Sequence, residues 1–459
     1  MAVSSTEERH DQGTEHAGQA ARCQGTEGEG SDRAPPLRVL VLGGGLIGAA
    51  LCDALVARGH QTSLATRSGR AHPGVRPRAL DFNALPAQPV LLDAMGDTDV
   101  LVNTVGIFRE GAEQSFDAIH VKAPVRLFAA AREAGVRRIV QLSALGADRR
   151  SPQGYQGSKG RAEHLLRGLG IDHAIVRPSL VFSPHGASTR WFARLASLPL
   201  LPLPGGGRQL VQPVHLDDLV EALVRLVEAP QVPATLDAVG PRPVSLHDYL
   251  DLFRSGMGTS GWSLAVPRPL ARAAVSMAAA LSPRFPVDAD ALAMLDAGNT
   301  ADPAPFAHWL GRPARAPRSF VSGATAAAMR WTSLTGWVVP TMRWTLALMW
   351  IATGIVSLWL YPRELGLGML GRVGLQGGLA EASLWSAALL DITLGLALLA
   401  ARWRTTAYVL QLLLVLGYTV VISVWLPEQW LHPFGPVLKN LPLLAMILAL
   451  LAMDRKPWI

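Results

Sequence analysis

The chain has 459 residues, of which 49% are hydrophobic and only 17% are charged. Because soluble globular chains carry about 25% charged residues, this composition excludes both a disordered chain and a wholly soluble enzyme. It indicates instead that part of the chain lies in lipid. Two cysteines exclude a disulfide scaffold and a cysteine-based zinc site, and no metal centre is predicted. The net charge of +7 comes without a run of lysines or arginines, which does not favour nucleic-acid binding.

The first segment, residues 1–36, is polar and rich in Gly, Glu and Gln. It has too few large apolar side chains to offset the entropy lost on ordering. It also lacks the apolar core of a signal peptide. We therefore predict a disordered tail, followed by a domain that is not exported.

Residues 37–300 alternate short apolar runs with longer stretches of helical spacing. This alternation is typical of βαβ units and predicts an α/β domain with a Rossmann-type parallel sheet. From about residue 240 the Gly and Pro content rises and the strand pattern fades, which indicates a smaller lobe on the substrate side. Residues 301–335 are expected to form a linker.

The last part of the chain, 336–459, is dominated by apolar stretches of roughly membrane-spanning length, which is about 20 residues. Ten of the 13 tryptophans lie from Trp331 onward, many at the ends of these stretches, where an aromatic belt is expected. None of the stretches shows the polar stripe of a soluble helix. We predict an all-α transmembrane domain with four spans, at about 337–360, 384–401, 405–426 and 437–453.

Basic residues predict the orientation of these spans. Arg402, Arg404 and the tail residues Lys456 and Arg455 fall on the side of the front domain. By the positive-inside rule this places the front domain in the cytoplasm, at the inner membrane of a bacterial cell.

One acidic residue, Asp391, falls inside the second predicted span. A carboxyl group there costs about 2.5–3.5 kcal/mol on insertion scales, so it usually faces a partner. Counting depth along the helices favours an ion pair with Lys439 at the start of the fourth span. The alternative is a protonated Asp391 that is hydrogen-bonded to Thr393 or Gln411.

A dinucleotide fingerprint opens the front domain. The run VLVLGGGLIG reads as a strand that leads into G-x-G-x-x-G at the start of a helix. Gly43 permits the tight turn, Gly45 lets the backbone approach a diphosphate, and Gly48 lets the helix pack close to the strand. Leu46 and Ile47 begin the helix, whose N-terminus faces the phosphates.

Cofactor preference depends on the end of the second strand. An NAD site usually has an acidic residue there, but no acid lies between Asp53 and Asp81, and Arg67 takes the place. A guanidinium suits a 2′-phosphate. The sequence therefore favours NADP, with NAD as the alternative. In the alternative interpretation, Arg67 is only a solvated surface charge.

Three residues form a catalytic pattern. Ser143 ends an apolar run, and Tyr155 and Lys159 follow at i and i+4 on a predicted helix, so they share one face. A nearby ammonium lowers a tyrosine pKa, which lets the phenol exchange a proton near neutral pH. Lys159 is also placed to hold the nicotinamide ribose, and Ser143 to orient a substrate carbonyl.

The front domain resembles the short-chain dehydrogenase/reductase superfamily, in particular the atypical, extended-like branch that includes the NAD(P)-binding accessory subunit of respiratory complex I. The resemblance implies that Asp81 and Phe82 lie near the adenine and that Pro178 lies near the nicotinamide. The glycine loop is one residue shorter than the G-x-x-G-x-x-G of that branch. Many relatives have lost the tyrosine, which this chain keeps. The matching segments include VNTVGIFRE, YQGSK and IVRPSLVF.

The C-terminal part resembles the DoxX-like membrane family, through the segments LLDITLGLALL and HPFGPVLKNLPLLAM. Taken together, the patterns predict a membrane-tethered NAD(P)-dependent oxidoreductase or epimerase. Its expected partners are membrane lipid and a small, lipid-soluble substrate such as a quinone or isoprenoid. The alternative is a catalytically silent nucleotide-binding module that assembles with the subunits of a membrane complex.

Overall fold

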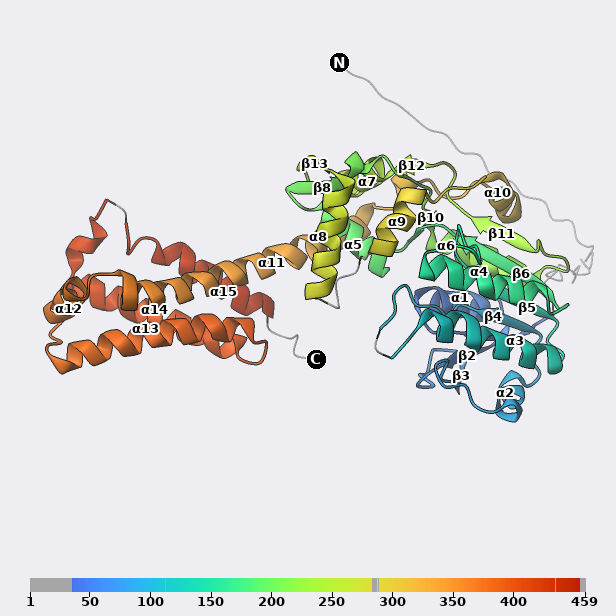
Figure 1. Ribbon diagram of the computed structural model, residues 1–459, viewed down its shortest axis with the longest axis horizontal. Helices are drawn as coiled ribbons and strands as arrows, with labels where there is room; N and C mark the ends of the chain where they lie inside the picture. The colour runs from blue at the N-terminus through green and yellow to red at the C-terminus, as the bar shows by residue number, and fades with distance from the viewer. Residues whose placement is uncertain (1–34, 112, 283–286, 288, 434, 455–459) are drawn as a thin grey trace, which may run out of the picture. The chain divides into compact units, whose positions relative to one another are not determined.

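A computed structural model describes the chain from residue 35 to residue 454, except residues 112, 283–286, 288 and 434 (Figure 1). The tail predicted for residues 1–36 lies almost wholly outside the described residues. The structure has a parallel α/β sheet domain with a smaller lobe, followed by an all-helical region, so the predicted fold class is confirmed.

The sheet has seven parallel strands in the order β11-β6-β5-β4-β1-β2-β3. The order reverses between β1 and β4, and such a switch point is where ligands bind at the carboxyl ends of the strands. The strands are β1 (Arg38–Leu42), β2 (Gln61–Thr66), β3 (Arg76–Ala79), β4 (Val100–Asn103), β5 (Arg138–Leu142), β6 (Asp172–Pro178) and β11 (Thr235–Ala238).

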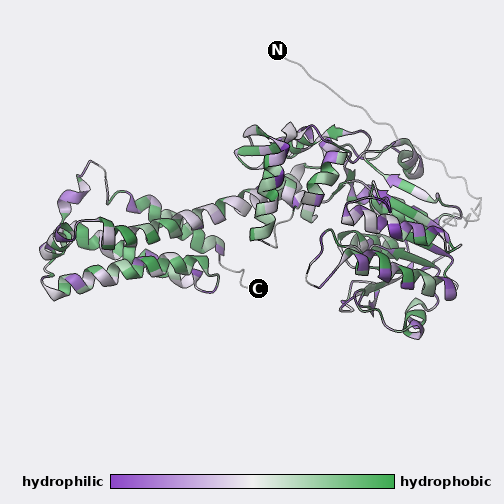
Figure 2. Cartoon of the chain, in the orientation of Figure 1, coloured by the Kyte–Doolittle hydropathy of each residue, from purple (hydrophilic) through white to green (hydrophobic). Residues whose placement is uncertain are grey.

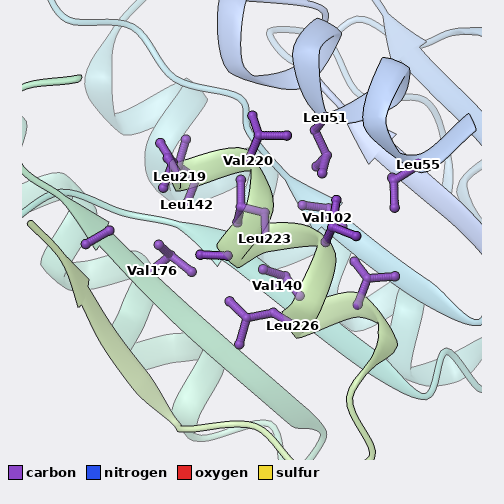
Figure 3. Packing of buried hydrophobic residues seen from close by; sticks show 14 of the residues in the cluster. Leu51, Leu55, Val102, Val140, Leu142, Val176, Leu219, Val220, Leu223 and Leu226 are labelled. Carbon is purple, nitrogen blue, oxygen red and sulfur yellow. The ribbon is translucent and has the colours of Figure 1, made fainter. Parts of the chain in front are cut away.

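Helices cover both faces of this sheet, and alternate residues of each strand serve alternate faces. Val39 and Val41 pack under α1 and α6, whereas Leu40 and Leu42 pack under α2, α3 and α4. Figure 3 shows the first face, where leucines of α1 and α6 meet valines of the strands. These helices are α1 (Leu46–Ala57), α2 (Gln88–Met95), α3 (Ala123–Glu133), α4 (Gly154–Arg167) and α6 (Leu216–Glu228), and a π-helical turn, η1 (Asp117–Lys122), precedes α3.

The lobe has its own apolar core, built around Phe182, Leu201, Tyr249 and Phe253. Its strands are β7 (Val181–Phe182), β8 (Leu200–Pro204), β9 (Leu210–Val211), β10 (Val214–His215), β12 (Val244–Ser245) and β13 (Trp262–Val266). Its helices are α5 (Ala187–Ala196), α7 (Leu246–Met257), α8 (Arg268–Leu281) and α9 (Ala289–Ala297), with short 3₁₀ turns η2 (Gly205–Gly207) and η3 (Pro317–Ser319).

Residues 301–335 contribute to two cores, the one between the sheet and α6 and the one inside the lobe. Within this stretch, α10 (Ala304–Leu310) buries Phe306 and Leu310 in the core beneath α6. The long helix α11 (Gly323–Ile355) then begins, and its first turns bury Ala326 and Met329 in the core of the lobe.

The C-terminal region is strongly apolar, as Figure 2 shows. Among the described residues, three helical segments are long and apolar enough to cross a membrane: 323–360, 378–399 and 404–425. The fourth predicted span is a shorter apolar helix of 15 residues. The elements are α11 with its π-helical extension η4 (Val356–Leu360), α12 (Arg363–Arg372), α13 (Gly378–Leu399), α14 (Arg404–Trp425), the turn η5 (Pro427–Trp430) and α15 (Asn440–Asp454).

Two glycines bring α11 and α13 into close contact. A Cβ on Gly354 would lie 2.5 Å from the Ala388 carbonyl oxygen, and one on Gly395 would lie 2.8 Å from the Ala347 carbonyl oxygen. Small residues at such positions let membrane helices approach backbone to backbone.

The predicted ion pair between Asp391 and Lys439 is wrong. Neither residue makes an ion pair in the described part of the chain, and the buried Asp391 Oδ1 has no hydrogen-bond partner there. Lys439 is exposed ahead of α15, whereas Asp391 is buried in the bundle. The alternative partners are also engaged elsewhere: Thr393 donates to the Leu389 carbonyl, and the Gln411 amide donates to the Leu394 carbonyl.

Candidate active site

The turn between β1 and α1 has the geometry that its three glycines predict. Gly43 has a φ of +94°, which favours glycine. A Cβ on Gly48 would lie 1.9 Å from the Gly43 carbonyl oxygen, so only glycine permits this packing. A Cβ on Gly45 would meet no atom within 4 Å. The backbone at Gly45 therefore faces open space.

The start of α1 is suited to an anion. Gly45 is the N-cap, no side chain caps the helix, and its first turn holds no acid. The N–H groups of Leu46 and Ile47 are therefore available to a ligand. Thr104 fixes the turn by sharing its single hydroxyl proton between the carbonyl oxygens of Leu42 and Gly43, at 2.8 and 3.0 Å. This arrangement fits the diphosphate of a dinucleotide.

Arg67, Asp81 and Phe82 lie near the carboxyl ends of the next two strands. Arg67 follows β2 and is exposed, with Nη1 3.7 Å from a carboxylate oxygen of Glu113. Asp81 follows β3 and accepts a hydrogen bond from the backbone N–H of Asn83 at 2.9 Å. Phe82 is partly buried and packs on the core beneath α2 and α3.

Lys159 lies with its ammonium group in the middle of the site. Nζ donates to the carbonyl oxygens of Leu142, at the end of β5, and Val105, just after β4, at 3.1 and 3.5 Å. Burial lowers the pKa of Lys159 to about 8, although Glu163 on the same helix opposes the shift. Val105 also contacts the position of Gly43, so Lys159 is close to the glycine turn.

Tyr155 stands one helical turn before Lys159 and is surrounded by aromatic rings. Its ring centroid is 4.7 Å from that of Phe108, 5.7 Å from that of His120 and 6.1 Å from that of Phe116. The phenol makes no hydrogen bond in the described part of the chain. Burial raises the pKa of Tyr155 to about 12. The expected lowering by Lys159 is therefore not found, because desolvation is the dominant effect.

His120 belongs to this cluster, and the sequence analysis did not identify it. Its Nε2 accepts from the Ile107 N–H at 3.0 Å, so Nδ1 carries the proton and donates to Ser158 Oγ at 2.9 Å. Ser158 in turn donates to the Tyr155 carbonyl at 2.8 Å. Burial and the charge of Lys159 lower the pKa of His120 to about 3, so the ring is neutral. The only signal in the sequence was its place in the segment FDAIHVKAP.

Ser143 lies at the end of β5 but turns toward a carboxylate. Its Oγ donates to Glu163 Oε1 at 2.6 Å, and Arg177 Nε donates to the same oxygen at 2.8 Å. Arg167 donates to the other carboxylate oxygen at 3.1 Å. The Glu163 carboxylate raises the pKa of Arg177. Since a hydroxyl has one proton, Ser143 in this arrangement can accept from a substrate but cannot donate to its carbonyl.

Pro178 ends β6, and its carbonyl accepts from the Leu145 N–H at 3.0 Å, in the loop that follows Ser143. The predicted residues are thus distributed over the carboxyl ends of β1, β2, β3, β5 and β6 and the first turns of α4. This is the edge at which a doubly wound sheet binds a dinucleotide.

Comparison with known proteins agrees with this geometry. Residues 39–237 match the NAD dependent epimerase/dehydratase family, and residues 347–448 match the DoxX-like family. The chain therefore carries an epimerase-type NAD-binding domain, followed by a DoxX-like domain. A solved nucleoside-diphosphate-sugar epimerase from Staphylococcus aureus has the same fold, with a TM-score of 0.52 and 17% identity over 62% of this chain and 100% of that one.

Curated relatives match part of the chain. Subunit 9 of the mitochondrial NADH dehydrogenase (ubiquinone) 1 alpha subcomplex of mouse (Mus musculus) is 30% identical over 32% of this chain and 38% of its own length. An epimerase family protein of Mycobacterium bovis is 26% identical over 51% of this chain and 81% of its own. The chain spans less than half the length of the mitochondrial relatives that it matches.

Proposed function

We propose that the protein is a membrane-anchored NAD(P)-dependent oxidoreductase or epimerase of the short-chain dehydrogenase/reductase type. The observation that carries the proposal is the position of Lys159. Its ammonium is buried against the carbonyl oxygens that end β5 and follow β4, one turn from Tyr155 and next to the glycine turn. Burying a lysine ammonium without a carboxylate partner costs free energy of desolvation. A role in nucleotide-dependent proton transfer would explain why the charge is kept there.

Different residues of the site would contact different parts of the cofactor. Gly45, Leu46 and Ile47 would hold the diphosphate, with Gly43 and Gly48 shaping the turn. Arg67 would hold a 2′-phosphate, which makes NADP the preferred form and NAD the alternative. When bound at this edge, the cofactor would supply hydride chemistry through its nicotinamide. The remaining contacts are Asp81 and Phe82 at the adenine, Pro178 at the nicotinamide, and Tyr155 and Lys159 at its ribose.

Tyr155 would be the acid and base of the reaction. With a pKa near 12 it is protonated at neutral pH, so it is ready to donate its phenolic proton to a carbonyl oxygen that becomes a hydroxyl. In the opposite direction it would accept that proton. Lys159, charged below pH 8, would stabilise the phenolate that forms. Ser143 would accept a hydrogen bond from the substrate and would be oriented by Glu163.

The substrate class follows from the anchor. The DoxX-like domain and the apolar helices support a membrane location, so the proposed substrate is a lipid-soluble carbonyl, hydroxyl or quinone compound. The front domain would lie on the cytoplasmic side of a bacterial inner membrane.

The test uses purified full-length protein in nanodiscs. NADPH oxidation is measured with a panel of quinones and carbonyl compounds, and nucleotide binding is measured separately. Tyr155→Phe should keep nucleotide binding but lose about 10²–10⁴-fold in rate, the usual contribution of a positioned acid or base. Failure of the wild-type protein to bind either nucleotide would refute the proposal.

A second function is supported by two observations. About a third of the chain is similar to subunit 9 of the mitochondrial NADH dehydrogenase (ubiquinone) 1 alpha subcomplex, and the proton of Ser143 is already engaged by Glu163. The chain would then bind a nucleotide as a structural module of a membrane complex. In that case the wild-type protein binds NADPH, turns over no member of the panel, and co-purifies with other subunits.

A further inference from the structure

The lobe exposes large apolar side chains on two consecutive elements. On β13, Trp262 is 82% exposed, and Leu264 is also exposed. On α8, which follows at once, Leu270, Met277 and Leu281 are exposed, the last by 80%. We call these five residues, two on β13 and three on α8, the α8 face. Soluble proteins rarely leave such a group of large apolar side chains uncovered.

The three large apolar side chains that α8 exposes lie on one side of the helix. Successive residues turn by 100°, so positions 270, 277 and 281 fall within a narrow sector. The side that meets the lobe is different: Ala271 is buried there. A third sector is polar, since Arg272 donates to Asp296 of α9 at 3.0 Å and Ser276 is exposed. The helix is therefore held to the lobe and presents its apolar face outward.

The lobe is joined directly to a membrane helix. Trp337 of α11 donates from its indole nitrogen to Ser197 Oγ, just after α5, at 3.2 Å. Further along α11, Arg343 donates to Asp454 at the end of α15, at 2.6 Å. The six residue steps from Trp337 to Arg343 rise about 9 Å at about 1.5 Å each. The contact with the lobe and the Arg343–Asp454 ion pair of the bundle are thus about 9 Å apart along α11.

We propose that the α8 face docks on the bilayer that α11, α13 and α14 cross, with its apolar side chains in the boundary between headgroups and acyl chains. Helices with one apolar side and a polar, basic side lie in the membrane interface in this way, and tryptophan favours the same depth. On α8 the basic side is that of Arg268 and Arg272, opposite the apolar sector, where both residues pair with Asp296. The lobe would then be held on the membrane by a second contact besides α11.

The proposal does not depend on the enzymatic function, because it concerns a surface outside the candidate active site. It is tested on full-length protein reconstituted into phosphatidylethanolamine–phosphatidylglycerol vesicles. Single spin labels are attached at Met277→Cys and Leu281→Cys, in a Cys23→Ser background that keeps the buried Cys52. Ser276→Cys, on the polar sector of the same helix, is the matched control.

Collision rates with oxygen, which concentrates in lipid, and with a water-soluble nickel chelate locate each label. At positions 277 and 281 we expect the oxygen-to-nickel ratio to exceed that at position 276 several-fold. A ratio at 277 and 281 equal to that at 276 would show a hydrated surface and overturn the proposal. Spin–spin coupling between labels of different molecules, with low access to both reagents, would assign the face to a second copy instead.

Discussion

Two buried carboxylates, one in the front domain and one in the helical bundle, are treated in opposite ways. Glu163 accepts hydrogen bonds from Ser143, Arg177 and Arg167. Asp391 has an unpartnered Oδ1 among the described residues, and two further buried polar atoms of the bundle are also unpartnered: Gln411 Oε1 and Trp350 Nε1.

The Glu163 carboxylate is a charge fixed by its partners, whereas the Asp391 carboxyl is free to bind another group. An ion pair with several hydrogen bonds fixes the relative positions of α4, β5 and β6, and losing one partner leaves an uncompensated charge. Gln411 lies at about the level of Asp391 in the bundle, because its amide donates to the carbonyl of Leu394, about one turn along α13 from Asp391. Nothing in the described bundle neutralises that carboxyl, so its removal costs little.

The largest effect should come from breaking the paired site. Arg177→Leu leaves Glu163 with one arginine, and we expect the front domain to lose on the order of 3 kcal/mol in free energy of unfolding. Pulse proteolysis of the full-length protein in urea measures this. Arg161→Leu removes an exposed arginine of α4, the helix that carries Glu163. This variant should change the free energy of unfolding by less than about 0.5 kcal/mol. Equal losses in the two variants would mean that the Glu163 pair is not stabilising.

The next effect concerns Lys159, whose charge lacks a direct carboxylate partner. Because its pKa is about 8, the ammonium is present below pH 8 and is lost as the pH rises through it. If it holds the nicotinamide ribose, NADPH should bind about tenfold more weakly at pH 9 than at pH 7, since a charged hydrogen bond contributes about 1.5–3 kcal/mol. Titrations of NADPH fluorescence measure this, and Lys159→Met should remove the pH dependence. A pH-independent affinity in the wild-type protein would exclude the contact.

A comparable or smaller effect is expected at Arg67. NADPH should bind more tightly than NADH by on the order of tenfold, and Arg67→Ala should erase most of the difference. Glu113→Gln, which removes the carboxylate beside Arg67, should increase the preference. Equal affinities of the wild-type protein for the two nucleotides would contradict the assignment.

The smallest effect should come from the unpaired carboxyl. Asp391→Leu should leave the stability of the bundle unchanged or slightly raised, whereas Arg343→Leu should lower it, because Asp454 then loses its partner. Thermal unfolding in detergent compares the two variants. In the wild-type protein, a lipid-soluble carbodiimide should label Asp391 in preference to Asp454. A clear loss of stability in Asp391→Leu would reveal a partner for this residue.

Local patterns predicted the parts of the fold that depend on local sequence. Alternating apolar runs gave the parallel sheet, and the glycine spacing gave a turn whose φ at Gly43 and packing at Gly48 agree with it. The i,i+4 spacing placed Tyr155 and Lys159 on one helix. These features depend on residues close together in the chain, so the sequence alone contains the information.

Features that depend on tertiary contacts were missed. The capture of Ser143 by Glu163 requires β6 to bring Arg177 against α4, and no spacing predicts that contact. The pKa of Tyr155 depends on how deeply the aromatic cluster buries it. Counting residues along helices placed Asp391 and Lys439 close enough in depth for their side chains to bridge the difference, but it carried no information about the direction in which each side chain points around its helix.

The most direct test of the account is nucleotide binding at the start of α1. A side chain at Gly45 would meet no protein atom within 4 Å, so Gly45→Asp should fold normally, with unchanged circular dichroism and elution. It would nevertheless place a negative charge where the diphosphate is proposed to bind. We predict that NADPH binding, measured by isothermal titration calorimetry, is lost in Gly45→Asp and retained in part in the isosteric Gly45→Asn. Unchanged affinity in the aspartate variant would contradict the assignment of this turn as the nucleotide site.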